Sequence, residues 1–405
     1  MTGVVSGRGC SSRPAWAEVD LAALRRNVAA LAAFVSPALV CAVVKADAYG
    51  HGAVAVAREA LDAGASWLAV ALVEEGVELR EAGIEAPVLL LSEPPPGAME
   101  EAVARRITPS IYSAEGLSSV AALARHLDRR VGIHLKVDTG MHRVGSDPLE
   151  VPALARSARD APGVYIEGLW THLAVADGAS RQDREFTQVQ LSALAGTLSA
   201  LRAEGIDPPL VHAANSAGAI AHRGSRLGMV RCGIALYGAL EPLGGCDEPG
   251  AMALQESLQP VMSLRARVSA LRELPRGARP SYGRLRPLEQ DSVVATVPLG
   301  YADGVPRRWF SNGGTVLVGG EHRPLAGMVT MDQIVVDCGP GSKVRAGDEV
   351  VLIGRQGVAE LNVLDWASRL GTISYEVLCG IGPRVPRVFL NGSREDRHEG
   401  QDEEV

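Results

Sequence analysis

Runs of apolar residues alternate with stretches of helical periodicity along residues 15–237. The first long run, Leu39–Val44, predicts a buried strand, because strands covered on both faces lose their polar alternation. Helices bounded by glycine or proline are expected between such runs, for example at residues 53–63, 74–82, 114–127 and 185–203. The strands are predicted to end near the following residues: Ala46, Leu72, Ser92, Tyr112, Asp138, His172, Asn215 and Tyr237. Repeated strand–helix units favour parallel pairing, since each crossover needs a connection of helix length.

The number of these units favours a closed barrel. About eight of them within roughly 220 residues is the size of a (β/α)₈ barrel. An open, doubly wound sheet is the rival architecture, but the placement of polar residues at the strand ends, described below, favours the barrel. Ahead of the repeat, Trp16–Asp20 predicts a short strand and residues 21–34 a helix that Asp20 caps.

The pattern of the sequence changes after Tyr237. Residues 241–250 have the composition of a linker, and residues 261–389 show short β-branched runs separated by Gly, Pro and Asp. This pattern predicts a smaller, mostly antiparallel β domain, with one helix at residues 358–370. We therefore expect a flexible N-terminus at 1–14, the barrel at 15–245, the β domain at 246–390 and a disordered acidic tail at 391–405.

Composition narrows the class of protein. A content of 47% hydrophobic and 21% charged residues is typical of a globular chain, and the net charge of −7 gives no basic surface for nucleic acid. No apolar stretch has the length of a membrane span, and no secretory signal is visible, so we expect a cytoplasmic protein with no membrane partner. The six cysteines lack the spacing of a zinc site, and no metal is expected.

Polar residues coincide with the predicted strand ends, where a barrel of this type carries its chemistry. Lys45 ends the first strand and is followed by the glycines at 50 and 52, which break the strand and open the next helix. Further candidates stand at later strand ends: Lys136, Asp138 and Arg143 around the fifth, His172 at the sixth, Asn215 and Ser216 at the seventh, and Arg231 in the eighth. Each has an ordinary structural explanation, but their coincidence at one end of the barrel favours a functional site.

Two kinds of chemistry are available at this end. Desolvation can make Lys45 a neutral amine able to form a Schiff base, although a lysine reaching out of the barrel rim is the alternative. Asn215 and Ser216 open a helix after a strand, and Gly233 with Ile234 allows close backbone approach, which together suit a phosphate. A simple helix cap would also explain Ser216.

Several motifs carry a resemblance that covers most of Ala15–Phe389. They are VVKADAYGHG at 43–52, IHLKVDTGMHRVG at 133–145, GLWTHLA at 168–174, VHAANSAG at 211–218, MVRCGIALYG at 229–238, PLGYADGVPR at 298–307, GMVTMDQIVVD at 327–337 and SYE at 374–376. The chain is similar to the alanine racemases, which use pyridoxal 5'-phosphate. The resemblance implies that Lys45 holds this cofactor, that Tyr49 and Tyr375 reach its phosphate, and that Arg231 faces its pyridine nitrogen.

The resemblance also implies a second base and a shared site. Tyr301 would act on the face opposite Lys45 and come from the other subunit of a head-to-tail homodimer, with His172 and Arg231 lowering its pKa. Arg143, the backbone at Met331 and the neighbouring Asp332 would bind the carboxylate of alanine, and Lys136 matches a lysine often held as a carbamate. His142 departs from the family, which often has a small residue there.

The function implied is the interconversion of L- and D-alanine, which supplies D-alanine for cell-wall peptidoglycan. Three alternatives stay open from the residues alone. One is a related racemase for serine or basic amino acids, another a non-catalytic barrel that carries pyridoxal phosphate, and the third a fold-related decarboxylase. The second domain with its Tyr301 loop speaks against the non-catalytic barrel, and the GYADG motif speaks against the decarboxylase.

Overall fold

The computed structural model describes residues 5–6, 13–244, 246 and 248–392. Most of the predicted flexible N-terminus and nearly all of the predicted acidic tail lie outside the described residues. The domain boundaries drawn from the sequence stay a prediction.

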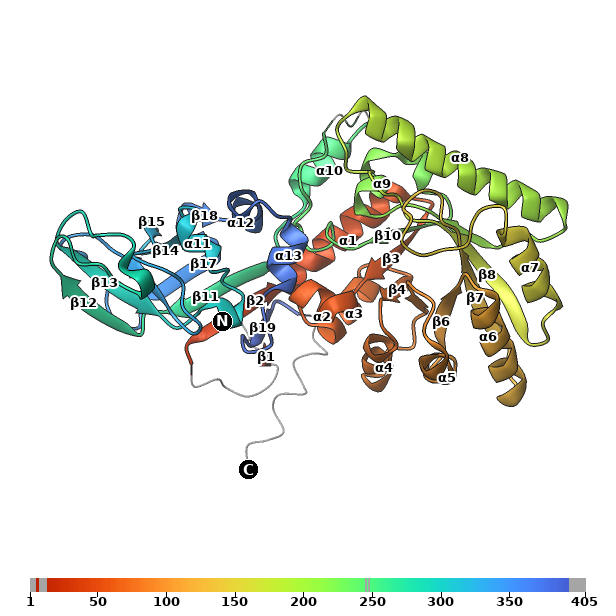
Figure 1. Ribbon diagram of the computed structural model, residues 1–405, viewed down its shortest axis with the longest axis horizontal. Coiled ribbons are helices and arrows are strands. Elements are labelled where there is room, and N and C mark those ends of the chain that lie inside the picture. The colour runs from red at the N-terminus through yellow and green to blue at the C-terminus, as the bar shows by residue number, and fades with distance from the viewer. Residues whose placement is uncertain (1–4, 7–12, 245, 247, 393–405) are drawn as a thin grey trace.

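Eight parallel strands close into a barrel, in the order β10-β3-β4-β5-β6-β7-β8-β9 (Figure 1). They are β3 (Leu39–Val43), β4 (Trp67–Val70), β5 (Val88–Leu90), β6 (Ile107–Ile111), β7 (Val131–Lys136), β8 (Val164–Trp170), β9 (Leu210–His212) and β10 (Met229–Cys232). The pairing of β10 with β3 closes the barrel. The barrel is therefore confirmed and the open sheet excluded.

Helices cover the outside of the barrel (Figure 1). They are α1 (Leu21–Val35), α3 (Ala53–Asp62), α4 (Val73–Glu81), α5 (Pro96–Ala104), α6 (Ala114–His126), α7 (Val151–Asp160), α8 (Arg181–Ala203) and α9 (Ser216–Ala221). Asp20 caps α1 as predicted, because its Oδ1 accepts hydrogen bonds from the backbone of Ala22 and Ala23. Helix α8 begins earlier than predicted, since Ser180 and Asp183 form a reciprocal capping box there.

The second unit is built on two further sheets (Figure 1). The larger has the order β1 (Val5–Ser6), β19 (Arg387–Leu390), β2 (Ala15–Asp20), β11 (Met262–Arg267), β17 (Glu349–Gln356), β14 (Thr315–Val318) and β15 (Glu321–Pro324), with β18 (Ala359–Leu361) paired to β17. The smaller contains β12 (Ala270–Leu274), β13 (Ser292–Val297) and β16 (Ile334–Asp337). Its helices are α11 (Arg308–Ser311), α12 (Val363–Leu370) and α13 (Ser374–Cys379), while α10 (Ala251–Ser257) lies between the units. All pairs in these sheets are antiparallel except β19 with β2, which confirms a mostly antiparallel second domain.

The strand predicted at Trp16–Asp20 is β2, which pairs with β11 and β19 outside the barrel; every second residue of it is fully buried. Two sequence predictions need correction. The predicted helix at 358–370 starts at Val363, because Asn362 caps it and the residues before form a hairpin with β17. The eighth strand ends at Cys232 and not at Tyr237, since Gly233 starts a turn in which the N–H of Leu236 bonds its carbonyl.

Arg387 ties the second unit to the barrel. Its Nε donates to the carbonyl of Gly50 at 2.8 Å, and its Nη1 donates to the carbonyls of Gly382 and Val385. Gly50 is required at this contact, because a Cβ there would lie 2.7 Å from the carbonyl oxygen of Leu378 in α13. Among the described residues, no helix combines the length and apolarity that crossing a membrane requires.

Candidate functional site

Lys45 begins an unusual turn at the carboxyl end of β3. In α2 (Lys45–Gly50), residues 46–49 all have φ between 52° and 55°, a left-handed conformation that is costly for residues with a Cβ. The surroundings hold it in place. The backbone N–H of Ala46 donates to Glu75 Oε1 at 2.6 Å, and Nδ1 of His51 donates to the carbonyls of Ala48 and Tyr49 at 2.9 and 3.0 Å. The turn thus fixes the backbone from which both Lys45 and Tyr49 project.

The amine of Lys45 sits in an environment that favours its neutral form. Burial lowers its pKa from the ordinary value of 10.5, and the positive charge of Arg143 lowers it further, while Glu75 and Cys379 oppose the shift. A neutral amine is the nucleophilic form of lysine. This supports the desolvated amine over the lysine that reaches out of the rim.

The turn after β10 lies against the N-terminus of α9. Ser216 Oγ accepts hydrogen bonds from the N–H groups of Gly233 (3.0 Å) and Ala235 (3.3 Å). Asn215 caps α9 by accepting from the N–H of Gly218, and Ile234 follows in the same buried turn. The predicted phosphate residues of β9 and β10 are therefore neighbours.

Tyr49, in the turn that follows β3, lies against the turn that follows β10. A Cβ at Gly233 would lie 2.3 Å from the Tyr49 hydroxyl, so only glycine permits this approach. The ring of Tyr49 is 5.0 Å from that of Tyr237 and 5.9 Å from that of Tyr375, which reaches in from α13. Two hydroxyls with backbone and side-chain donors around a glycine turn fit a phosphate group.

Arg231 is buried at the centre of the barrel end. Its Nη2 donates to the carbonyls of Thr171 (2.9 Å) and Ala213 (3.0 Å), and its Nη1 donates to Nδ1 of His212 at 2.8 Å. Burial lowers its pKa to about 10, which leaves the guanidinium protonated at neutral pH. The guanidinium lies 4.4 Å from the ring centre of Trp170.

Lys136 approaches the same tryptophan ring. Its Nζ lies 4.2 Å from the ring centre of Trp170 and donates to the carbonyl of Leu91 at 2.9 Å. Burial lowers the pKa of Lys136 to about 7, and the nearby charges of Arg231 and Arg143 add to the effect. This amine is therefore largely neutral just above neutral pH.

A narrow cleft joins Lys136 to the loop after β7. It is lined by Lys136, Val137, Asp138, Met141, Arg143, Val144, Thr171 and His172. Asp138 shapes the loop, since its Oδ1 accepts from the N–H groups of Gly140 and His142. His172 lies with its Nδ1 3.2 Å from Arg231 Nη2, and burial followed by the charge of Arg231 lowers its pKa well below 6.5.

Tyr301 and Met331 lie together in the second unit. The N–H of Tyr301 donates to the carbonyl of Thr330, and the N–H of Ala302 donates to that of Met331. A Cβ at Gly300 would be 2.3 Å from both carbonyl oxygens, so glycine allows the two loops to touch. Asp332, beside them, is paired with Arg384 at 2.7 Å.

The barrel residues and this loop pair form two groups within one chain. Tyr301 is 44% exposed and Met331 52% exposed. Across the described residues, no hydrogen bond, ion pair or ring contact links either side chain to Lys45, Arg231 or the cleft. The structure thus brings together the predicted barrel residues, and separately Tyr301, Met331 and Asp332.

Sequence reasoning missed several residues of this site, chiefly His51, Glu75, Trp170 and His212. A signal was present for two of them: residues two apart on a strand share a face, and Trp170 stands two before His172. His212 is the last residue of β9 and stands three residues before the predicted site residue Asn215. The contacts of Glu75 and His51 with the left-handed turn have no such signal, because they depend on tertiary structure.

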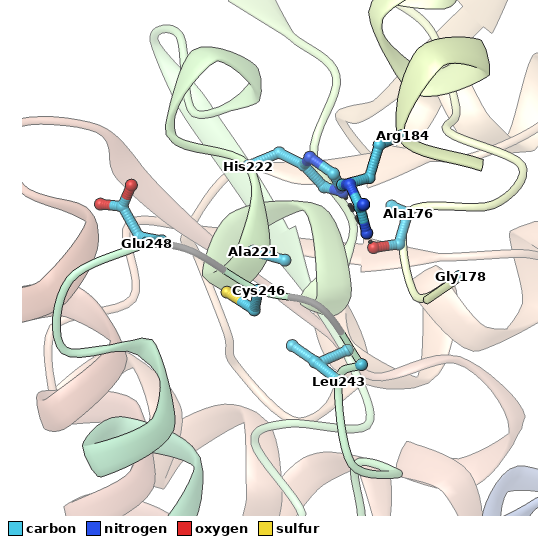
Figure 2. A pocket seen from close by; sticks show the side chains of 9 residues that line it. Ala176, Gly178, Arg184, Ala221, His222, Leu243, Cys246 and Glu248 are labelled. Atoms are coloured by element: carbon cyan, nitrogen blue, oxygen red, sulfur yellow. Dashed lines mark hydrogen bonds between the residues drawn. The ribbon is translucent and has the colours of Figure 1, made fainter. Parts of the chain in front are cut away.

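A second cleft lies apart from these residues. It is lined by Ala176, Gly178, Arg184, Ala221, His222, Leu243, Gly244, Cys246 and Glu248, and His222 Nε2 donates to the carbonyl of Ala176 at 3.1 Å (Figure 2). None of the predicted site residues lines it. Within the described parts of the chain, no group of three or more His, Cys, Asp or Glu side chains forms a metal-binding cluster.

Comparisons with known proteins match almost the whole chain. The family model of the alanine racemase N-terminal domain matches residues 19–241, and that of the C-terminal domain matches residues 261–389. The alanine racemase of Symbiobacterium thermophilum is 44% identical over 93% of this chain and 97% of its own length. That of Desulfovibrio desulfuricans is 40% identical over 93% and 98%.

Solved structures agree. The crystal structure of alanine racemase from a D-cycloserine-producing Streptomyces lavendulae has a TM-score of 0.87 and 38% identity, covering 96% of this chain and all of that one. The Bacillus anthracis alanine racemase with bound L-Ala-P has a TM-score of 0.86 and 36% identity, covering 95% and 97%. The fold is thus that of a two-domain alanine racemase along almost the whole chain. The chain belongs to the alanine racemase family, which depends on pyridoxal phosphate.

Proposed function

We propose that this protein interconverts L- and D-alanine with pyridoxal phosphate held by Lys45. The observation that carries the proposal is the placement, at one end of one barrel, of a desolvated amine, a buried guanidinium and a hydroxyl-lined glycine turn. The turn at Gly233, with Tyr49 and Ser216, fits the phosphate, and Tyr375 borders it. Arg231 lies where it can meet the ring nitrogen. When bound, the cofactor withdraws electrons from the substrate Cα and makes its hydrogen acidic.

Arg231 determines how strongly that withdrawal acts. Its guanidinium carries donors and no acceptor, so the nitrogen it faces keeps its lone pair and stays unprotonated. Most enzymes of this cofactor place a carboxylate there. An arginine weakens electron withdrawal and disfavours transamination and elimination, which suits a racemase that makes few side products.

Racemisation needs a proton-transferring group on each face of the substrate. Lys45 serves one face, and Tyr301 of a second subunit serves the other in a head-to-tail homodimer. The exposure of Tyr301 and the absence of any described contact with Lys45 support a shared site. Because Arg231 donates to Nδ1 of His172, the proton of that imidazole lies on Nε2, where it can donate to the phenol oxygen and stabilise its deprotonated form.

Substrate orientation rests on the cleft beside His172. Arg143 offers a fork for the alanine carboxylate, with the N–H of Met331 and the neighbouring Asp332 supplied by the same partner loop as Tyr301. The neutral amine of Lys136 can react with carbon dioxide, forming an N–C bond and releasing a proton. The carbamate would place a negative charge beside Arg143 and fix its fork. The role that family membership implies is a cytoplasmic supply of D-alanine for peptidoglycan.

The function is tested by racemisation and by trapping. We expect each alanine enantiomer to become racemic, and borohydride reduction of the cofactor-loaded protein to leave the adduct on Lys45. The assignment is sharp because the chain has three lysines, Lys45, Lys136 and Lys343. Lys343→Met is the control and keeps activity and adduct. Faster racemisation of serine or a basic amino acid, release of carbon dioxide, or cofactor binding without any turnover would each contradict the proposal in favour of one of its rivals.

The lowered pKa of Lys136 predicts how stability depends on pH. Between about pH 7 and its ordinary pKa of 10.5, the unfolded chain binds this proton and the folded chain does not. The free energy of unfolding should therefore rise with pH across that window, by about 2–3 kcal/mol between pH 7 and 9.5 from this group. Urea denaturation in CO₂-free buffer measures it. Lys136→Met should lose this part of the slope, whereas Lys343→Met keeps it; equal slopes in all three proteins would refute the prediction.

A further inference from the structure

A chain of polar contacts runs from Arg231 back through the barrel interior. Arg231 Nη1 lies 2.8 Å from His212 Nδ1, and His212 Nε2 lies 2.9 Å from His134 Nδ1. His134 Nε2 then lies 3.8 Å from Glu167 Oε2, a charge–dipole contact beyond hydrogen-bond length. Both imidazoles are fully buried, and His134 Nε2 has no hydrogen-bond partner among the described residues.

The protons in this chain can be arranged in one way only. Arg231 has donors alone, so His212 must accept at Nδ1 and carry its proton on Nε2. His134 must then accept at Nδ1 and carry its own proton on Nε2, which faces Glu167. Burial keeps both rings neutral, lowering the pKa of His134 to about 3 and that of His212 well below 6.5, with Arg231 adding to each shift.

The backbone is shaped to bring Glu167 into this line. The pairing of β7 with β8 shifts at Ile133 and His134, whose partners are Ile166 and Gly168, so Glu167 is the extra residue of a β-bulge. Bulges re-aim side chains, often beside active sites. A Cβ at Gly168 would lie 2.5 Å from His134 Nδ1, and one at Gly132 would lie 2.7 Å from Glu167 Oε2. Two glycines thus make room for the imidazole and the carboxylate.

Arg231 needs such a counter-charge. Among the described residues, the hydrogen-bond partners of its buried guanidinium are carbonyls and imidazoles and none is a carboxylate, and isolated buried charges are costly. Neutral imidazoles aligned between a cation and an anion are polarised by both, which strengthens each link. The ring of Trp170 stacks on His212 with centres 5.6 Å apart and holds it in the line.

We propose that Glu167 and His134 are positioning residues for Arg231, which hold its guanidinium opposite the cofactor through His212. The carboxylate orients the His134 N–H, this imidazole holds the His212 N–H, and His212 in turn fixes the rotamer of the arginine. The inference rests on the proposed function in one respect, that Arg231 meets the ring nitrogen of pyridoxal phosphate.

Nitrogen-15 NMR of histidine side chains tests the chain of contacts directly, in the full-length protein without and with pyridoxal phosphate. His134 and His212 should each show a proton on Nε2 and a bare Nδ1, with both N–H protons shifted downfield and protected from exchange. Glu167→Gln, which keeps the shape and removes the charge, should move the His134 proton upfield and that of His212 by a smaller amount. Assignment comes from His134→Asn and His212→Asn.

Glu59→Gln is the matched control. Glu59 is a buried carboxylate of the same barrel unit. It is paired with Arg25 at 2.6 Å and takes no part in the contacts that run from Arg231 to Glu167. Its loss should lower stability without moving the two histidine signals. Unmoved signals in Glu167→Gln, or equal shifts in Glu59→Gln, would overturn the proposal. If Glu167→Gln does not fold, His134→Asn gives the same reading at His212, because its amide oxygen accepts the His212 proton but cannot reach Glu167.

Kinetics separate this inference from the proposed function. Glu167→Gln should lower kcat for alanine about tenfold while KM changes less than twofold, since outer-shell partners of a site residue carry effects of this order. It should also raise the absorbance of the long-wavelength cofactor band during turnover. A protein with intact histidine signals but no racemisation would refute the proposed function alone. Normal kinetics in Glu167→Gln would refute the positioning role alone.

Discussion

We expect that mixing the Lys45→Ala and Tyr301→Ala proteins restores racemase activity that each variant lacks alone. Each variant by itself should lose about 10²–10⁴-fold in kcat, because each lacks one proton-transferring group. In a mixed dimer, one site combines both substitutions and is inactive. The other combines Lys45 of one subunit with Tyr301 of its partner and is intact. Random reassociation of equal amounts should therefore recover about a quarter of wild-type activity, from half of the dimers with one working site each.

The experiment needs subunit exchange and a control for it. Brief exposure to mild denaturant followed by dilution allows reassociation, and differently tagged chains report the mixed fraction. Mixing Lys45→Ala with Lys45→Ala,Tyr301→Ala gives mixed dimers with no intact site and should stay inactive. Recovery that follows the mixed fraction supports the shared site. Mixed dimers that form without any recovery would show that Lys45 and Tyr301 of the same chain work together.

The separation of Tyr301 from Lys45 has a local cause. Gly300 lets the Tyr301 loop touch the backbone of Met331, and Asp303 fixes the same loop by accepting from the N–H of Gly300 and pairing with Arg13. The proposed second base and the proposed backbone donor for the carboxylate are therefore one rigid pair. A partner subunit would deliver both together, which explains why both are exposed in the single chain.

The barrel could be predicted from sequence because its strands are buried on both faces. Runs such as Leu39–Val44 carry no polar alternation, and the polar residues at their ends mark the functional end. The position of β2 outside the barrel could not be predicted, because alternation indicates a half-exposed strand but not its partner. The pairing with β11 depends on residues about 250 positions away.

A site residue could be predicted where its residue type alone defines its role. It could not be predicted where contacts with neighbouring residues define its conformation or role. Nothing in Ala46–Tyr49 indicates a left-handed turn, since its residues carry no strong preference for that conformation except Asp47. The turn exists because Glu75 and His51 bind its backbone. The contact of His134 with Glu167 similarly depends on a bulge, which requires knowledge of the pairing of β7 with β8.

Replacing Arg231 by lysine should lower both the stability of the protein and its affinity for the cofactor, although the positive charge is kept. The guanidinium satisfies four acceptors, the carbonyls of Thr171 and Ala213 and the Nδ1 atoms of His172 and His212. A lysine ammonium cannot span them in one plane. With two acceptors left unpaired, we expect the free energy of unfolding to fall by about 3 kcal/mol in urea denaturation. We also expect affinity for pyridoxal phosphate to fall by about tenfold or more.

Arg226→Lys separates general loss of an arginine from loss of this position. Arg226 is also mostly buried, donates to the carbonyl of Ala219 and pairs with Glu248, but its hydrogen bonds and ion pair reach none of the residues proposed to hold the cofactor. The Arg226→Lys protein should be less stable than the wild type but keep its cofactor affinity and the NMR signals of His134 and His212. Because His212 accepts from Arg231, Arg231→Lys should disturb both histidines even without cofactor. Unchanged histidine signals together with full cofactor affinity in Arg231→Lys would show that charge alone, and not the fork, organises this end of the barrel.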